Sequence, residues 1–552
     1  MKKKIIGIFV CTLLIATVPS ILGAGSEEKH NVQNTIEMQN DYIGHRNTAP
    51  LLQTPEVDWI QTYDYGEFDM FRGVCETPDG GFIVSGSTER SNIIYPLVMK
   101  LDSGGNEVWN WTADQVFYDG EWYNITDSQL QFVHYYADED IYIVCTMLAV
   151  YYPDSGKDEY IGVLLKFNDM GFVDVMTYLF DLDVWDMIPY AMCETTNGFM
   201  ITGVGLEISD PANLKAALVK TDFSGVVQWY KLYDYDAGDD ETYGICHTSD
   251  DCYILGGTIH YNTIYQDYWL IKTDADGNHL WNKTFGGPES NQGFSPYLFE
   301  TTDGGYISGT WGGSSYGMGM GDLWIIKTDA DGTMEWNETF GSPINDATWC
   351  MNAATEHGVN GYVFLLTEGF SAPSFHTRVI FTDENANAFW SVEIDDPSIH
   401  EMGQQIAQTS DGEYIITGRT AMYPSIASDA MIIKLSPSSE LPAQPTMKAR
   451  PRSGWIYLFD IIGLPFPLTT DALIYSDDFT FKAKVADASG VDKVEFFIDG
   501  IYINDTNITQ GLFKTYNFLW TGAEKGTYNV KIRAYNMYGG TCKEEVKVKK
   551  LM

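Results

Sequence analysis

Basic residues are scarce in this chain of 552 residues, which has 33 lysines and arginines against 76 aspartates and glutamates. The formal net charge of −43 creates a negative surface potential that repels phosphate backbones and anionic lipid headgroups. We therefore expect no nucleic-acid partner. Cations, cationic ligands and neutral polar ligands such as glycans are compatible with this charge.

Long apolar runs are absent after the first 24 residues. The N-terminus places three lysines before an apolar stretch from Ile5 to about Leu22, and small residues follow it, which is the order of a secretory signal. We predict a signal peptide over residues 1–24, with an uncleaved membrane anchor as the alternative, and a flexible leader over residues 25–52. The expected location is secreted or on the outer cell surface.

Cysteines are few, and Cys11 lies inside the predicted signal, which leaves an odd number in the exported chain. One repeat position is filled by a compact apolar residue in six copies: Cys75, Cys193, Cys246, Phe299, Ala353 and Ala407. We predict that the cysteines at this position are buried thiols. A local disulfide between Cys246 and Cys252 is the alternative.

Motifs of catalysis and metal binding are also missing. The nine histidines show no His-x-x-x-His spacing, and no phosphate-binding glycine loop occurs. The Asp-x-Asp-Gly segments at Asp274 and Asp329 run directly into a strand, so we interpret them as hairpin turns and not as calcium loops. No catalytic residue, metal ligand or cofactor is predicted, although the many acidic residues could supply a catalytic pair.

Internal repetition is the dominant feature that is present. The clearest copies, which begin at Gly244 and Leu298, each have an apolar strand, a tight turn, a second strand, a variable loop, a strand that ends in Lys-Thr-Asp, and a strand centred on tryptophan. The Lys-Thr-Asp aspartate position recurs at Asp102, Asn168, Asp222, Asp274, Asp329, Asp383 and Ser436. Short β-rich runs at this spacing predict an all-β chain whose residues 53–436 form a seven-bladed β-propeller.

The ends of the repeat region indicate how the ring closes. The seventh copy stops after Leu435 without a tryptophan-centred strand, whereas an unpartnered strand, Val57 to Tyr63, precedes the first copy. We predict that this N-terminal strand completes the seventh blade and removes an exposed edge. The composition of residues 437–453 predicts a linker, and period-two alternation over residues 454–552 predicts an immunoglobulin-like β-sandwich.

The repeat from Thr301 to Tyr306, together with the segments Trp269 to Asn278 and Trp281 to Gly287, resembles propeller repeats of secreted archaeal and bacterial surface proteins. The spacing of aspartate, glycine and tryptophan is also similar to the tryptophan-docking motif of quinoprotein propellers, where it packs blades together. The segment from Ala488 to Gly500 resembles prokaryotic immunoglobulin-like domains of exported proteins. These resemblances imply a fold and no specific activity.

One end of each predicted blade has long and individual loops between the second and third strands. These loops combine aromatic rings with Ser, Asn and Gly, a mixture that suits sugars or extended peptides. The predicted binding residues are Tyr152, Tyr265, Trp311, Tyr316 and Phe375.

From these loops we predict a non-enzymatic binding or adhesion protein that contacts a glycan or an extracellular protein. An extracellular hydrolase or lyase with acidic residues near the propeller axis is one alternative, and a structural component of the cell surface is another. A cluster of carboxyl groups with raised pKa values in a central pocket would favour the enzyme.

Overall fold

The computed structural model describes residues 54–551, so the predicted signal and leader lie outside the described residues. Within this range the following residues are also not described: 119–120, 153–156, 182–184, 208–213, 236–237, 261–265, 287–296, 313–320, 343–345, 370–375, 395–399, 422–427, 440, 442–445, 451–454, 459–461, 466–471, 476–478, 488–490, 508–512, 522–523 and 537–538. The described residues form β-strands and contain no helix, hence no helix that could cross a membrane.

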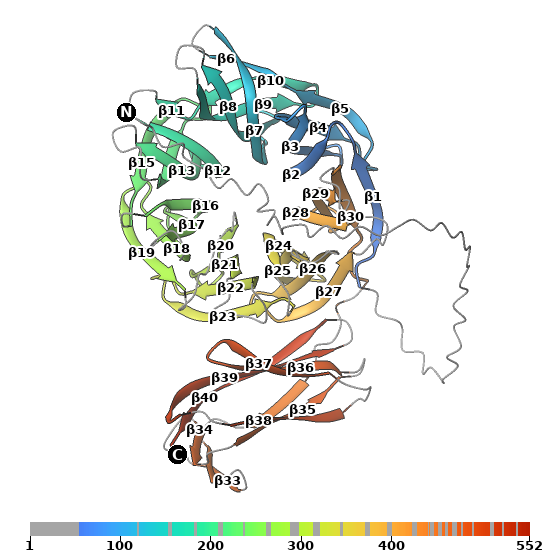
Figure 1. Cartoon of the computed structure of the whole chain (residues 1–552), viewed down its shortest axis with the longest axis vertical. Helices are drawn as coiled ribbons and strands as arrows, with labels where there is room; N and C mark the ends of the chain where they lie inside the picture. The colour runs from blue at the N-terminus through green and yellow to red at the C-terminus, as the bar shows by residue number, and fades with distance from the viewer. Residues whose placement is uncertain are drawn as a thin grey trace, which may run out of the picture. The chain divides into compact units, whose positions relative to one another are not determined.

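Seven small antiparallel sheets follow one another along the chain (Figure 1). Sheets 1 to 3 consist of β2 (Phe68–Glu76), β3 (Phe82–Arg90), β4 (Ile93–Leu101) and β5 (Glu107–Thr112); β6 (Gln115–Tyr118), β7 (Glu121–Tyr136), β8 (Ile141–Tyr152), β9 (Lys157–Asn168) and β10 (Gly171–Tyr178); and β11 (Phe180–Asp181), β12 (Trp185–Thr195), β13 (Gly198–Glu207), β14 (Leu214–Thr221) and β15 (Val227–Tyr233).

Sheets 4 to 6 consist of β16 (Asp240–His247), β17 (Tyr253–His260), β18 (Gln266–Thr273) and β19 (His279–Phe285); β20 (Leu298–Glu300), β21 (Tyr306–Gly312), β22 (Asp322–Thr328) and β23 (Met334–Phe340); and β24 (Ala347–Glu356), β25 (Val359–Glu368), β26 (His376–Asp383) and β27 (Ala388–Ile394). Sheet 7 consists of β28 (His400–Gln408), β29 (Tyr414–Ala421), β30 (Ala430–Leu435) and β1 (Val57–Tyr63).

Each sheet contacts the next along the chain, and sheet 7 contacts sheet 1. The innermost long strand of each sheet contacts strands of the sheet before it, and β2 of sheet 1 contacts β28, β29 and β30 of sheet 7. Figure 1 shows these strands on the inner side of a ring of sheets. Strand β1 pairs with β30 from Val57 opposite Leu435 to Tyr63 opposite Ala430, which is the pairing expected from the sequence.

The repeated polar residues of the turns bond to one another. In the turn between the first and second strands, the aspartate accepts a hydrogen bond from a threonine hydroxyl and pairs with the lysine of the Lys-Thr-Asp strand. Lys327 Nζ lies 3.0 Å from Asp303, and Lys272 Nζ lies 2.7 Å from Asp250. In the turn after the third strand, Asp274 Oδ1 accepts the backbone N–H groups of Asp276 and Asn278, as a hairpin turn requires.

Tryptophans of the outer strands pack against turn glycines of the next sheet. A Cβ atom added to Gly277 would lie 2.6 Å from Cη2 of Trp229, and one added to Gly332 would lie 2.7 Å from Trp281. Both glycines have positive φ angles, 73° and 74°. The packing and the backbone conformation therefore both require glycine.

The C-terminal domain has two further sheets. One contains β31 (Thr446–Arg450), β35 (Phe479–Ala486) and β38 (Phe513–Trp520). The other contains β32 (Trp455–Leu458), β33 (Ile462–Pro465), β34 (Ala472–Tyr475), β36 (Val491–Ile498), β37 (Ile501–Asn507), β39 (Gly526–Asn536) and β40 (Thr541–Lys550). Strand β31 lies inside residues 437–453, which the sequence predicted as a linker. It pairs with β35, so the domain begins before residue 454.

The interior of this domain is apolar. Phe481, Phe496 and Trp520 belong to one buried cluster, and the ring centroids of Phe481 and Trp520 are 5.4 Å apart. The seven cysteines of the described residues are free thiols, Cys246 and Cys252 among them. Cys75, Cys193 and Cys246 are thiols as predicted, but they are partly and not fully buried. Burial raises the pKa of the Cys75 and Cys350 thiols to about 12, which makes them unreactive at neutral pH.

The tryptophan contact predicts a difference between two glycines. We expect Gly277→Ala to lower the free energy of unfolding by about 2–4 kcal/mol, because the methyl group meets Trp229 and the residue has a positive φ angle. Gly304→Ala is the matched control, because Gly304 has a φ angle of 81° but no atom within 4 Å of the added Cβ. It should cost only about 1–2 kcal/mol. Urea unfolding of both variants measures this, and equal losses would contradict the packing role.

Candidate functional site

The residues predicted from the loops are mostly outside the described residues. Tyr265, Tyr316 and Phe375 are not described, and of Tyr152 only the backbone is described, at the end of β8. Trp311 is described: it lies on β21 opposite Leu323 of β22 and is half-buried. All four loops join the second strand of a sheet to its third, so each emerges at the same end of its own sheet.

A β-bulge recurs in the inner strand of every sheet except sheet 5, where the residues directly before Tyr297 are not described. At one bulge in each of these strands the register with the next strand skips one residue: Arg72, Gln131, Tyr190, Tyr243, Trp349 and Gln404. We call these six the bulge residues. Bulges are common next to functional sites, because the extra residue re-aims a side chain.

The bulge residues stand at one repeat position. Arg72, Tyr190 and Tyr243 each lie three residues before a cysteine of the apolar repeat position. In sheet 6 the register corrects the prediction for that position. Asn352 pairs with Val363, which in turn pairs with Phe381, so Asn352 and not Ala353 corresponds to Cys75. Trp349 then has the same spacing as the other bulge residues.

Aromatic rings of neighbouring sheets meet at this level. The ring centroids of Tyr190 on β12 and Tyr243 on β16 are 4.8 Å apart. Tyr190 is partly exposed, whereas Tyr243 is 8% exposed. Trp349 on β24 is partly exposed, and its Nε1 donates a hydrogen bond of 3.0 Å to Thr367. Tyr190 and Trp349 thus expose part of their rings at the repeat position that Arg72 and Gln404 occupy in sheets 1 and 7.

An acidic group adjoins the tyrosine pair. Tyr243 donates a hydrogen bond from its hydroxyl to Glu241, two residues earlier on β16. Burial raises the pKa of the Glu241 carboxyl, and the charge of Asp239 adds to this, while Tyr243 and His260 act in the opposite direction. A carboxyl group with a raised pKa keeps its proton to a higher pH than an exposed glutamate does.

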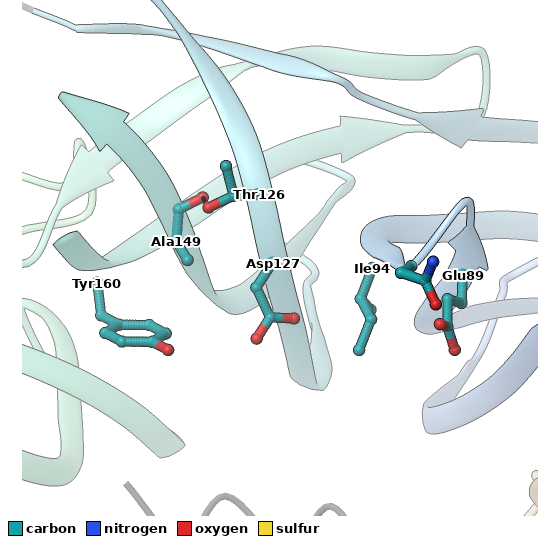
Figure 2. A pocket seen from close by; sticks show the side chains of 7 residues that line it. Glu89, Ile94, Thr126, Asp127, Ala149 and Tyr160 are labelled. Atoms are coloured by element: carbon teal, nitrogen blue, oxygen red, sulfur yellow. Dashed lines mark hydrogen bonds between the residues drawn. The ribbon is translucent and has the colours of Figure 1, made fainter. Parts of the chain in front are cut away.

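A surface pocket lies between sheets 1 and 2. It has a volume of about 310 Å³ and is lined by Glu89, Asn92, Ile94, Thr126, Asp127, Ala149 and Tyr160. Figure 2 shows the carboxylate of Asp127 between the ring of Tyr160 and the side chain of Ile94, with Glu89 beyond Ile94. The lining from β3 and β4 comes from the end at which the second and third strands are joined. In sheet 1, polar side chains of this pocket therefore lie at the end of the sheet where the second and third strands are joined.

Three side chains of types that can bind a metal ion lie close together near the start of β26. Single ligand atoms of Glu368, His376 and Glu393 are within 4.8 Å of one another. Arg378, however, donates to both glutamates, at 2.8 Å from Glu368. Burial raises the pKa of Glu368, but its bonds to His376 and Arg378 lower it below its usual value overall. The guanidinium already supplies the positive charge that a cation would bring, so we interpret the group as an ion-pair network.

Asp346 lies beside this network, just before β24, and is fully buried. Its carboxylate accepts hydrogen bonds from the Ser342 hydroxyl at 2.9 Å and from the Gly369 backbone at 3.0 Å. Burial raises its pKa to about 6, and the nearby charge of Glu368 contributes. Asp346 precedes β24 of sheet 6, whereas Glu241 lies on β16 of sheet 4, and neither lines the pocket between sheets 1 and 2.

Comparison with known proteins identifies the C-terminal domain. Residues 467–532 match the bacterial Ig domain family. No curated protein matches the chain significantly. Its immunoglobulin-like domain is therefore of the bacterial type, in agreement with the sequence prediction.

Solved structures with detectable similarity are distant. The extracellular domain of a putative one-component system from B. thetaiotaomicron is 12% identical, with a TM-score of 0.37 over 90% of this chain and 58% of that chain. This chain thus spans less than two thirds of that domain. Sqt1 of Chaetomium thermophilum is 9% identical (TM-score 0.41, 69% and 98% covered), and the polysaccharide lyase Uly1 is 10% identical (TM-score 0.39, 67% and 90% covered). Similarity at this level does not define a function.

The raised pKa of Asp346 predicts a pH dependence. The folded state holds this proton up to about pH 6, whereas the unfolded chain releases it near 3.8, so the stabilisation present below about pH 4 is lost as the pH rises through 6. Relative to Asp346→Asn, which does not titrate, the wild type should lose up to about 3 kcal/mol over this range. Urea unfolding at several pH values measures the difference.

Asp303→Asn is the control for this experiment. Its bonds to Thr301 and Lys327 lower the pKa of Asp303 to about 2, so its difference from wild type should stay constant above about pH 5. A constant difference for Asp346→Asn as well would contradict the raised pKa.

Proposed function

We propose that the seven sheets are the blades of a closed seven-bladed β-propeller, and that the protein is a secreted or cell-surface binding protein that takes a glycan. The return of sheet contacts from sheet 7 to sheet 1 and the pairing of β1 with β30 support the closed ring. The signal-like N-terminus and the bacterial Ig domain support an extracellular location.

The glycan proposal rests on the bulge residues, which share one repeat position on the inner strands. Sugars have apolar ring faces and polar edges, so aromatic rings bind their faces while amides and charged groups bind their hydroxyls. Tyr190, Tyr243 and Trp349 supply rings, and Gln404 and Arg72 supply polar groups at the corresponding position. The predicted loop residues, among them Trp311, would extend the site toward the loop-bearing end.

One observation favours the second candidate, an extracellular hydrolase or lyase. Glu241 has a raised pKa and lies beside the tyrosine pair, where a bound sugar would be in reach of a proton donor. A catalytic role would require turnover of the bound glycan that Glu241→Gln abolishes. Binding without turnover, unaffected by Glu241→Gln, is the outcome expected for a binding protein.

The binding proposal predicts which aromatic residues matter. Tyr190→Ala and Trp349→Ala should each weaken binding to a glycan-array hit by about tenfold, because a stacking surface is lost. Phe117→Ala is the matched control: Phe117 is an aromatic residue, 49% exposed, on β6, and its removal should leave affinity unchanged. Titration calorimetry with each purified variant measures the affinities.

A triple variant of the loop residues, with Trp311, Tyr316 and Phe375 changed to alanine, separates the two parts of the site. A loss in the triple variant alone would move the site from the inner strands to the loops. Glycan binding that neither the bulge variants nor the triple variant alters would contradict the proposal.

A further inference from the structure

Two aromatic side chains lie exposed on the hairpin that β6 and β7 form. Trp122 is 66% exposed and Phe117 is 49% exposed, more than any other aromatic side chain of the described residues. The two residues pair across the hairpin, and their ring centroids are 5.3 Å apart. Strand β6 is the last of its sheet and pairs only with β7. An exposed aromatic face at a sheet edge can associate with other chains, so natural proteins cover such edges.

An acceptor pattern for N-linked glycans adjoins this aromatic pair. Asn124, Ile125 and Thr126 form the sequence Asn-x-Thr, to which glycans are attached in exported proteins. Asn124 is exposed and lies two residues after Trp122 on β7. Because successive side chains of a strand point to opposite faces, Asn124 and Trp122 share one face of the hairpin.

The side-chain amide of Asn124 can carry a substituent in the folded protein. Its Oδ1 accepts a hydrogen bond of 2.8 Å from Nε2 of Gln115, the residue opposite on β6. Its Nδ2 donates no hydrogen bond within the described part of the chain. Attachment of a glycan replaces one hydrogen of Nδ2 and leaves Oδ1 as an acceptor, so the bond from Gln115 persists after modification.

Other Asn-x-Thr segments have a structural explanation. Three of them follow the tryptophan of an outer strand and recur with the repeat, at Asn110, Asn282 and Asn337. Asn110 donates from Nδ2 to Glu107 at 2.6 Å. Nδ2 of Asn282 lies 2.9 Å from Nε2 of His279. The threonine that follows Asn337, Thr339, is only 3% exposed. Asn124 lies outside this repeat pattern, and its Nδ2 has no such role.

We propose that Asn124 carries an N-linked glycan whose first sugar covers Trp122 and Phe117. The apolar face of a sugar ring stacks on aromatic rings while its hydroxyl groups stay in water. Residues two apart on a strand are about 6.6 Å apart, so a sugar bonded to Nδ2 of Asn124 can reach the ring of Trp122. The inference does not rest on the proposed binding function, because it concerns a glycan attached to the chain itself.

The modification is a group transfer from an oligosaccharide that a diphosphate links to a lipid carrier. Nδ2 of Asn124 forms a bond to C1 of the first sugar, the bond from C1 to the diphosphate oxygen breaks, and one amide proton leaves with the lipid diphosphate. The hydroxyl of Thr126 completes the acceptor pattern. In the folded chain this hydroxyl donates to the carbonyl of Ala149 at 3.3 Å, so transfer is expected before β7 pairs with β8.

The first test is mass spectrometry of peptides from the full-length protein, purified from its native source. The peptide that contains Asn124 should be found mainly with a glycan attached. The peptide that contains Asn337 is the matched control and should be unmodified, because Thr339 is buried. An unmodified Asn124 would overturn the inference, and equal occupancy at both sites would overturn the structural selection of Asn124.

Hydrogen exchange tests whether the glycan covers the aromatic pair. Backbone amides of the β6–β7 hairpin should exchange about three- to tenfold more slowly in the glycosylated protein than in Asn124→Gln, because stacking suppresses local opening. Trp122→Ala should remove this difference and leave the glycan occupancy unchanged. Asn110→Gln is the matched control: Asn110 is also exposed, but Val108 and not an aromatic residue lies two positions before it. Equal exchange in wild type and Asn124→Gln would overturn the covering role.

The same chain produced in a host without the transferase separates the glycan from the amide itself. In that unmodified chain, Asn124→Gln should leave the exchange of the hairpin unchanged, and faster exchange would mean that the amide is structural and would overturn the covering role. Sedimentation identifies another occupant. A dimer of the native protein that Trp122→Ala dissociates, with Asn124 unmodified, would show that a second copy of the chain covers the aromatic pair and would overturn the inference.

Discussion

The contact between an outer-strand tryptophan and a turn glycine of the next sheet is the constraint on which the arrangement of sheets depends. Trp59, Trp229 and Trp281 each lie against such a glycine, so the contact occurs from sheet 7 to sheet 1, from 3 to 4 and from 4 to 5. In sheet 6, Ala386 takes the place of the glycine with a φ angle of 56° and packs in one cluster with Trp336. Because the tryptophan ring packs directly against a small turn residue of the next sheet, it fixes the spacing of the two sheets closely.

Fixed spacing between sheets has a consequence for their inner strands. Because each sheet is held at the same level as its neighbour, equivalent positions of the inner strands also come to one level, and the bulges of β12 and β16 bring two tyrosine rings together. The outer surface of the repeats thus carries the uniform residues, Trp and the turn Asp and Gly. The inner strands carry the variation, from Arg72 through Tyr190 to Trp349. Within each repeat, the residues that pack neighbouring sheets together are therefore separate from the inner-strand residues that differ between copies.

Much of this fold follows from the sequence alone. Apolar alternation, Asp-Gly turns and the missing last strand were sufficient to predict short strands and the pairing of β1 with β30, because these depend on local chemistry and on counting. The bulges were not predicted. Alternation along Arg72, Gly73 and Val74 does not reveal which residue the strand pairing skips, since that depends on the register with β3. A signal was nevertheless present, because Arg72, Tyr190, Tyr243 and Gln404 share one spacing to the apolar repeat position.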